Sequence, residues 1–232
     1  MLPDLRQRST AAELMDDRQI AGEELFIALR ELRFINTVLL GALPTLEGVA
    51  QLWHAAGQPP TLDLLDVGAG SGETSRLLLR WAAWRGLDLR ITLLDIHPLT
   101  CAVAAADFAT EPRITVQQGD LYALPAHAAD IVTASLVLHH FSPPDVPTVL
   151  RAMRRAARLG VVVNDLHRHL LAWLGIVVFT GLFSRNRMIR HDAPLSVARG
   201  FRAADLELVR RDPALAHLRY YWRPLFRYLM IL

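Results

Sequence analysis

The stretch LLDVGAGSG, Leu64–Gly72, decides the fold. An apolar run ends in three glycines at alternate positions, and residues without a Cβ let the backbone turn sharply and approach a ligand. We therefore expect a buried strand, a tight turn and a helix that begins near Glu73. The spacing G-x-G-x-G departs from the dinucleotide fingerprint, because Glu73 stands where the third glycine would be and puts negative charge where a pyrophosphate would bind. A plain turn between a strand and a helix remains the alternative for the glycines alone.

From residue 60 onward, short apolar runs alternate with longer amphipathic ones. Apolar strands separated by helices predict a doubly wound α/β fold, with a mostly parallel sheet covered on both faces. The expected strands are Leu62–Val67, Leu89–Leu94, Ile114–Gln117, Ile131–Val137, Val161–Asn164, His217–Trp222 and Phe226–Leu232. The expected helices are Glu23–Leu40, Leu46–Trp53, Glu73–Trp84, Leu99–Phe108 and Val146–Leu159.

The composition describes a globular protein and excludes several kinds of site. The chain of 232 residues is 52% hydrophobic and 21% charged, and all 25 basic residues are arginines, so lysine Schiff-base chemistry is excluded. A single cysteine, Cys101, excludes an internal disulfide and a cysteine-cluster metal site. A net charge of +2 gives no argument for nucleic acid as a partner. The amino terminus carries no apolar run of the signal-peptide kind, and we expect a cytoplasmic protein.

One apolar segment raises the question of a membrane. Leu170–Phe183 is apolar apart from Thr180, but it is shorter than the roughly 20 residues that cross a bilayer. Arginines on both sides of the segment would suit a membrane surface. We favour a helix of the substrate pocket or core, with peripheral membrane contact as the alternative.

Acidic residues accompany the first three predicted strands. Asp66 lies in the first strand, Asp95 follows the second and Asp120 follows the third. Ligands of an open parallel sheet bind beyond the carboxyl ends of its strands, at the point where the strand order reverses. An acidic rim at this edge suits a ligand with an ammonium group, ribose hydroxyls and an exocyclic amine. Each acid taken alone is also a common turn residue or helix cap.

Four motifs in a fixed order resemble those of one enzyme family. Leu64–Gly72, Leu94–His97, Gly119–Pro125 and Asp130–Phe141 resemble the successive motifs of class I S-adenosylmethionine (SAM)-dependent methyltransferases. The run LVLHHF in the last motif is similar to that of small-molecule enzymes of ubiquinone biosynthesis and natural-product (secondary) metabolism. Enzymes of this family that methylate exocyclic nitrogens of proteins or nucleic acids usually carry an acid or amide before a Pro-Pro pair and an aromatic after it. Pro143-Pro144 has neither, so that substrate class is disfavoured.

The resemblance implies a seven-stranded, mostly parallel Rossmann-like sheet and SAM as the cofactor. It implies one domain over residues 1–232: a helical N-terminal cover (1–58), a SAM-binding core (59–165), a helical insert or lid after the fifth strand (166–204), and a closing helix and strands (205–232). The residues that it assigns to SAM are Asp66, Gly68, Ala69 and Gly70 around the methionine moiety, Asp95 on the ribose, Ile96 against the adenine, Asp120 and Leu121 at the adenine edge, and Ser135 beside the methionine and sulfonium.

The reaction that we expect is O-methylation of a hydrophobic phenolic, quinol or polyketide-type small molecule. Such an acceptor needs a base for its proton, and histidine is the natural choice near neutral pH. His139 and His140 follow the fourth strand and Asp165 follows the fifth, so adjacent strands would bring a base and its orienting acid together. We expect one histidine to be catalytic and favour His139. Either histidine is alternatively a helix cap or a turn residue, and Asp165 a backbone cap.

The walls of the acceptor site are expected from the apolar N-terminal helices and from the insert. The candidates are His167, Phe26, Trp173 and Phe179. No set of residues in the sequence predicts a metal site. C- or N-methylation of a small molecule, and a SAM-binding partner protein without activity, remain the alternatives. The sequence leaves the oligomeric state open, a homodimer included.

Overall fold

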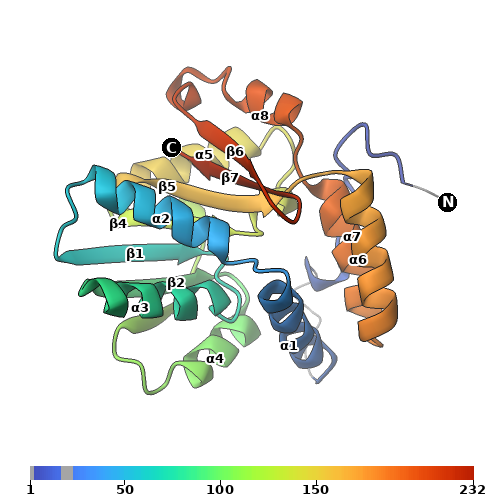
Figure 1. Ribbon diagram of the computed structural model, residues 1–232, viewed down its shortest axis with the longest axis horizontal. Helices are drawn as coiled ribbons and strands as arrows, with labels where there is room; N and C mark the ends of the chain where they lie inside the picture. Colours follow the sequence, from blue (N-terminus) through green and yellow to red (C-terminus); the bar gives the residue numbers. More distant parts are fainter. Residues whose placement is uncertain (1–2, 17–22) are drawn as a thin grey trace.

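A computed structural model describes residues 3–16 and 23–232 (Figure 1). Within these residues a seven-stranded sheet crosses the molecule, in the order β3-β2-β1-β4-β5-β7-β6. The strands are β1 (Thr61–Val67), β2 (Asp88–Asp95), β3 (Ile114–Gln118), β4 (Ala129–Ser135), β5 (Ala157–Leu166), β6 (Arg219–Arg223) and β7 (Arg227–Ile231). β7 runs antiparallel to its neighbours β5 and β6, and the other pairs are parallel. The predicted doubly wound, mostly parallel α/β fold is confirmed.

Helices cover both faces of the sheet because successive strand residues point to opposite sides. Leu64 packs in an apolar core with α2, α3 and α4, and Leu65 in another with α5 and α8. The α-helices are α1 (Glu23–Val38), α2 (Leu43–Ala55), α3 (Glu73–Arg85), α4 (Pro98–Asp107), α5 (Val146–Ala156), α6 (Leu170–Phe183), α7 (Arg187–Arg199) and α8 (Ala203–Val209). Short 3-10 helices are η1 (Leu14–Asp16), η2 (Leu121–Ala123), η3 (Leu138–His140) and η4 (Pro213–Leu215).

The fourth strand begins and ends two residues earlier than its sequence predicts. β4 ends at Ser135 and not at Val137, because Leu136 adopts a left-handed conformation with φ of 59° and turns the chain out of the sheet. The terminal strands β6 and β7 begin one or two residues after their predicted starts, which is the usual uncertainty of an element boundary.

The boundary between α5 and β5 also differs from the prediction. The helix ends at Ala156 and not at Leu159, and the strand begins at Ala157 and not at Val161. The amphipathic arginine-rich pattern predicts a longer helix, but pairing with Ala129 of β4 draws these residues into the sheet. Tertiary pairing here overrides the local pattern.

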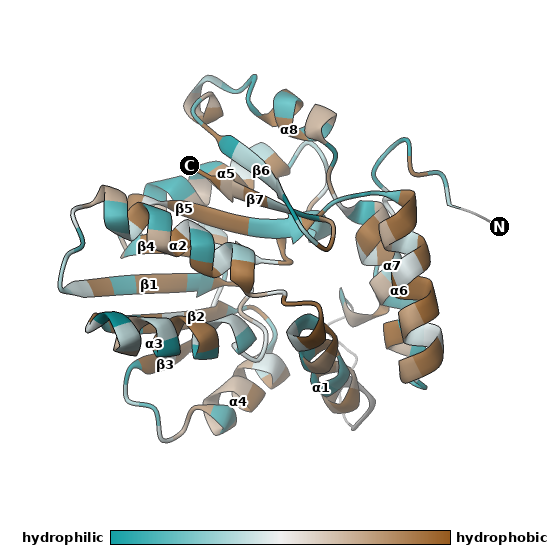
Figure 2. Cartoon of the chain, in the orientation of Figure 1, coloured by the Kyte–Doolittle hydropathy of each residue, from teal (hydrophilic) through white to brown (hydrophobic). Residues whose placement is uncertain are grey.

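The insert after β5 forms the helix pair α6 and α7, beside the end of the sheet (Figure 1). α6 is apolar along nearly its whole length (Figure 2). Its exposed apolar side chains are Leu170, Leu171, Leu174, Val178, Leu182 and Phe183. In the part of the chain that the structure describes, no helix has both the length and the apolar character needed to cross a membrane. Contact of α6 with a membrane surface stays a prediction.

The strand order reverses at β1 and β4, which are neighbours in the sheet although β2 and β3 lie between them in the chain. The carboxyl ends of β1, β2, β4 and β5 therefore meet at one edge, where Val67 pairs with Leu94 and Ser135 with Asn164. The N-terminal segment, residues 3–16, reaches the same edge, because Arg8 donates to the carbonyl of His139 just beyond β4. This edge is where a ligand of a doubly wound sheet binds.

Candidate active site

The glycine turn after β1 has a backbone that suits glycine alone. Gly68, Gly70 and Gly72 have φ of 61°, 57° and 74°, in the left-handed region. A Cβ on Gly68 would lie 2.6 Å from Val137, and one on Gly72 2.6 Å from Phe108, so protein packing requires these two glycines. Among the described residues, nothing lies within 4 Å of a Cβ on Gly70. Gly70 is therefore the point where a ligand can approach the backbone of the turn.

Asp66 is a buried carboxyl beneath this turn. It is 2% exposed and accepts a hydrogen bond from Oγ1 of Thr133 at 2.6 Å. Burial raises the pKa of Asp66 to about 7, although the hydrogen bond from Thr133 opposes the rise and the charges of Glu73 and Asp95 add to it. A cationic group brought to this position would favour the ionised carboxylate. The position thus fits the ammonium group of a methionine moiety.

Asp95 ties the end of β2 to the glycine turn. Its carboxylate accepts hydrogen bonds from the N–H of Gly70 at 3.0 Å and of His97 at 2.9 Å. The N–H of Ala69 donates to the carbonyl of Leu94 at 3.2 Å. Burial raises the pKa of Asp95, and the two backbone donors oppose the rise. Because a carboxylate has about four lone-pair sites, Asp95 keeps the capacity to accept the two hydroxyls of a ribose.

The remaining predicted cofactor residues lie along the same edge. Ile96 is 41% exposed and offers an apolar surface to a flat base, whereas Leu121 is buried in the core. The carboxylate of Asp120 accepts from the N–H two residues on at 2.9 Å, so the helix-cap alternative for this residue is realised. Oγ of Ser135 accepts from Nδ2 of Asn164 at 3.1 Å. Contact of these residues with a cofactor stays a prediction.

His139, just beyond β4, and Asp165, near the end of β5, form a buried pair; Asp165 lies within the strand and not after it as predicted, because β5 continues to Leu166 in its pairing with β7. Nδ1 of His139 lies 2.7 Å from Oδ1 of Asp165, and the two side chains are 3% and 0% exposed. The carboxylate also accepts from the backbone N–H of His139 at 3.1 Å and of Leu166 at 2.7 Å. Burial by itself would raise the pKa of Asp165. The charge and hydrogen bond of His139, together with the backbone donors, outweigh burial and hold that pKa below its ordinary value. The ionised carboxylate favours the tautomer of His139 with its proton on Nδ1.

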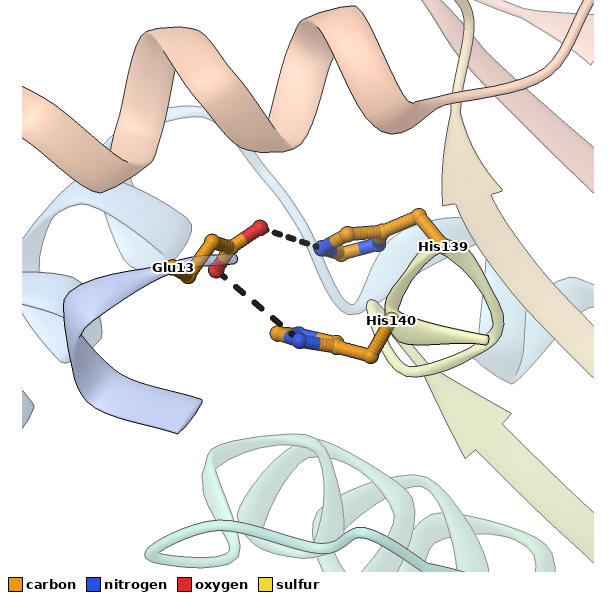
Figure 3. A group of neighbouring side chains, drawn as sticks. All are labelled: Glu13, His139 and His140. Atoms are coloured by element: carbon orange, nitrogen blue, oxygen red, sulfur yellow. Dashed lines mark ion pairs between the residues drawn. The ribbon is translucent and has the colours of Figure 1, made fainter. Parts of the chain in front are cut away.

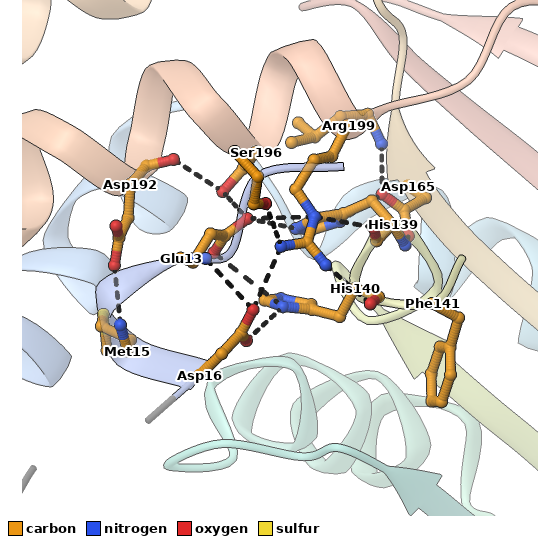
Figure 4. A network of polar contacts seen from close by, with 12 residues as sticks. Glu13, Met15, Asp16, His139, His140, Phe141, Asp165, Asp192, Ser196 and Arg199 are labelled. Carbon is orange, nitrogen blue, oxygen red and sulfur yellow. Dashed lines mark hydrogen bonds and ion pairs between the residues drawn. The ribbon is translucent and has the colours of Figure 1, made fainter. Parts of the chain in front are cut away.

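Two acids that the sequence does not predict at this site come from the N-terminal segment: Glu13 (Figure 3) and Asp16 (Figure 4). Oε1 of Glu13 lies 3.6 Å from Nε2 of His139, and Oε2 lies 3.9 Å from Nδ1 of His140. Oδ1 of Asp16 lies 2.7 Å from the same Nδ1. Their spacing of three residues indicates one turn of helix, but no local pattern indicates a contact with histidines so distant in the chain.

Two arginines, Arg8 and Arg199, hold the turn that carries the histidines, and Figure 4 shows Arg199 beside it. Arg199 donates to the carbonyls of His139 at 3.1 Å and His140 at 2.6 Å, and Arg8 donates to the carbonyl of His139 at 3.0 Å. Burial lowers the pKa of His140, but its hydrogen bond to Asp16 and the charges of the two acids outweigh burial and raise it above its ordinary value. The arginines and acids together fix both imidazoles in place.

The comparison with known proteins bears on this edge of the sheet. A family of methyltransferase domains matches residues 64–160, which contain the glycine turn, Asp95 and both histidines. Residues 64–160 are thus similar to a methyltransferase domain. Asp165 and the acids of the N-terminal segment lie outside the matched residues of this domain. No curated protein sequence matches the chain.

Solved structures share the fold of the methyltransferase domain at low sequence identity. A plantazolicin methyltransferase in complex with a monoazolic desmethylPZN analog and S-adenosylhomocysteine (SAH) superposes with a TM-score of 0.65 and 10% identity, over 88% of each chain. Human N-acetylserotonin methyltransferase in complex with SAM gives 0.59 and 17%, over 94% of this chain and 61% of that one. Magnesium protoporphyrin IX methyltransferase from Synechocystis PCC 6803 with bound SAH gives 0.54 and 18%, over 83% of each. The chain spans about half the length of other methyltransferases that it matches.

Glu13, His139 and His140 could also hold a metal ion by distance, since one ligand atom from each lies within 4.8 Å of the others. Arg199 already brings positive charge to these acids, at 3.9 Å from Glu13 and 3.1 Å from Asp16. Nδ1 of His140 is shared with Asp16. Because cations of the chain neutralise the acids, we assign no metal to this cluster.

The four residues predicted to line the acceptor site lie in separate places. Nδ1 of His167 accepts from Nε1 of Trp222 at 3.2 Å, beside the β6–β7 hairpin. Trp173 lines a surface cleft of about 440 Å³ between the N-terminal segment and α7. Phe179 packs in the small core shared by α1 and α7, and Phe26 on α1 is 47% exposed. The structure places none of the four against the histidine pair, and their contact with an acceptor stays a prediction.

Proposed function

We propose that the chain transfers the methyl group of SAM to a hydroxyl oxygen of a hydrophobic phenolic, quinol or polyketide-type small molecule. SAM supplies a methyl group activated by its sulfonium, so the chain has to align the acceptor, exclude water and remove the hydroxyl proton. The observation that carries the proposal is the buried pair of His139 and Asp165, 2.7 Å apart at the edge where the cofactor binds. Methylation of carbon or nitrogen needs less assistance from a base, and a SAM-binding protein without activity needs none.

In this proposal the acceptor proton goes to Nε2 of His139. Because Nδ1–H is donated to the ionised Asp165, Nε2 carries the lone pair. The carboxylate then stabilises the imidazolium that forms, as it does in a catalytic triad. Arg8 and Arg199 act as positioning residues, since both bind the carbonyl of His139.

The acceptor reaches Nε2 past the N-terminal segment. Glu13 faces Nε2 at 3.6 Å, which is longer than a hydrogen bond, and the carboxylate is held by Oγ of Ser196 at 2.9 Å. In our proposal the acceptor hydroxyl takes the place of the Glu13 carboxylate beside Nε2. The segment around Glu13 therefore moves when the acceptor binds.

The surroundings of the site support an apolar acceptor. α1 and α7 share a core, and α1 and α6 present apolar surfaces (Figure 2). Among residues 26–38 of α1, the exposed large apolar residues are Phe26, Phe34 and Val38. Apolar walls with a few polar groups suit an aromatic or lipid-tailed molecule.

The test replaces the base pair and measures transfer and cofactor binding separately. We expect His139→Gln and Asp165→Asn to lower turnover on phenolic acceptors by about 100-fold or more, which is the usual contribution of a general base. SAM affinity, measured by calorimetry, stays within a few-fold because neither residue is assigned to the cofactor. His217→Gln, at an exposed histidine, is the matched control and keeps full turnover. Unchanged turnover in both site variants contradicts the proposal, and SAM binding without transfer to any acceptor supports the non-catalytic alternative.

A further inference from the structure

Arg227 is a buried cation, and two of its three guanidinium nitrogens have no hydrogen-bond partner among the described residues. It begins β7 and is 3% exposed. Within residues 3–16 and 23–232, its Nε and Nη1 have no acceptor. The other buried arginines are paired: Arg168 lies 3.0 Å from Asp205, and Arg199 donates to backbone carbonyls. Buried N–H groups are almost always paired, so Arg227 suits a partner that the chain itself does not supply.

The charge of Arg227 is only weakly compensated. Burial lowers the pKa of Arg227 to about 10, and attraction to the charge of Asp165 opposes the shift. That carboxylate already accepts hydrogen bonds from His139. A buried charge without a partner is unfavourable, and an anion beside the guanidinium would remove the cost. The group that suits this position therefore carries negative charge.

A second unpaired polar group lies on the same face of the sheet. Arg227 pairs with Leu166, two positions after Asn164 on β5, so the side chains of Arg227 and Asn164 point to one side. Oδ1 of Asn164 is buried and also has no partner among the described residues. Nδ2 of Asn164 donates to Oγ of Ser135 at 3.1 Å. The unpaired acceptor of Asn164 thus lies beside Ser135, which the resemblance assigns to the sulfonium end of SAM, and the unpaired donors of Arg227 lie on the same face of the sheet.

The connection between α1 and α2 lies against the guanidinium. A Cβ on Gly41 would be only 3.1 Å from Nη2 of Arg227, and the carbonyl of Gly41 accepts from Nδ2 of Asn164 at 2.7 Å. The N-terminal helices, the sheet edge and Arg227 therefore meet at one place. A molecule bound there lies at the carboxyl end of β5, as the pair of His139 and Asp165 does.

We propose that Arg227 binds a carboxylate of the acceptor and that Asn164 accepts a hydrogen bond from a hydroxyl of the same molecule. The inference rests on the proposed function and names its substrate class, which is hydrophobic phenols that carry an acid. A guanidinium binds a carboxylate with two parallel N–H bonds. It discriminates against the uncharged analogue because the buried cation then stays unpaired.

The experiment compares two probes that differ only in the acid. Calorimetry in the presence of SAH measures the affinity of an alkylated hydroxybenzoate and of the matching alkylphenol. We expect the wild type to bind the hydroxybenzoate at least tenfold more tightly, Arg227→Met to lose this preference, and Arg227→Lys to keep part of it. Binding of the alkylphenol changes little in either variant.

Thermal unfolding separates a binding role from a structural one. Arg227→Met removes an unpaired buried charge, so we expect it to melt at or above the wild-type temperature. Arg168→Met is the matched control, because it breaks the ion pair with Asp205 and should melt at a lower temperature. A fall in melting temperature for Arg227→Met like that of the control overturns the inference.

The two proposals fail in different ways. A wild type that binds or methylates the alkylphenol as well as the hydroxybenzoate overturns the role of Arg227 and leaves O-methylation intact. Methyl transfer to carbon or nitrogen of an acidic acceptor contradicts the proposed function, while a preference for the acid that depends on Arg227 still supports the inference.

Discussion

Asp66→Asn tests the electrostatics of the cofactor site through the stability of the fold. Burial raises the pKa of Asp66 from 3.8 to about 7, so the folded protein holds a proton that the unfolded chain releases at lower pH. The unfolded chain therefore binds fewer protons between these two values, and the wild type loses stability as the pH rises through them. Asparagine stays neutral and can still accept the hydrogen bond from Thr133.

The magnitude follows from the two pKa values. A shift of about 3 units at about 1.4 kcal/mol per unit makes Asp66→Asn more stable than the wild type by about 4 kcal/mol well above neutral pH. At about pH 5 more than half of the ionisation cost has yet to appear, and the gain is about 2 kcal/mol. The difference between the two proteins should thus roughly double, growing by about 2 kcal/mol, between about pH 5 and about pH 8.

Urea unfolding of both proteins at the two pH values is the assay. Asp63→Asn, at an exposed carboxyl on the same strand, is the matched control and should change the free energy of unfolding by less than about 0.5 kcal/mol at either pH. If Asp66 binds the amino group of SAM, the stabilised variant also binds SAM at least tenfold more weakly, because it loses a charge-assisted hydrogen bond of about 1.5–3 kcal/mol. A gain in stability that does not depend on pH would refute the reasoning.

Three further results are expected. Treatment with EDTA leaves turnover unchanged, because Arg199 neutralises the acids near the histidines; a loss of rate that added Zn²⁺ or Mn²⁺ restores would contradict this. Gly72→Ala lowers the free energy of unfolding in urea by several kcal/mol, because its Cβ would lie 2.6 Å from the ring of Phe108. Gly86→Ala has a similar φ but open space around its Cβ, and it lowers that free energy by about 1–2 kcal/mol. Equal losses would rule out the steric explanation. Arg168→Met lowers the free energy of unfolding by about 3 kcal/mol because it removes a buried guanidinium from its ion pair with the partly exposed Asp205. Arg202→Met, at a more exposed arginine, lowers it by less than about 1 kcal/mol; equal losses would contradict a stabilising role for the ion pair of Arg168.

The sequence predicts the sheet because its strands are continuous apolar runs and the glycine turn follows the first of them. A buried parallel strand needs apolar side chains on both faces, so Leu64 and Leu65 point to different cores and both carry the signal. The same logic does not locate the start of β5. Ala157 and its neighbours look helical locally, and only their pairing with β4 makes them a strand.

The candidate site likewise has contacts that the sequence predicts and contacts that it does not. The contact of His139 with Asp165 could be predicted because both lie at the carboxyl ends of adjacent parallel strands, which come together at one edge of the sheet. Glu13 and Asp16 could not, because their approach depends on the path of a segment with no strand and little regular structure. Arg227 escaped prediction for a different reason: an arginine in a terminal strand usually points to solvent, and only the structure buries it.

The central claim, transfer of a methyl group from SAM to oxygen, is tested most directly with SAM labelled with ¹³C in its methyl group. The chain is incubated with labelled SAM and a panel of hydrophobic phenols and quinols, and the product is analysed by ¹³C NMR, which distinguishes a methyl ether from methyl on carbon or nitrogen. We predict a methyl ether with the wild type and a strongly reduced yield with His139→Gln. A labelled methyl on carbon or nitrogen, or no labelled product although SAM binds, would contradict the claim.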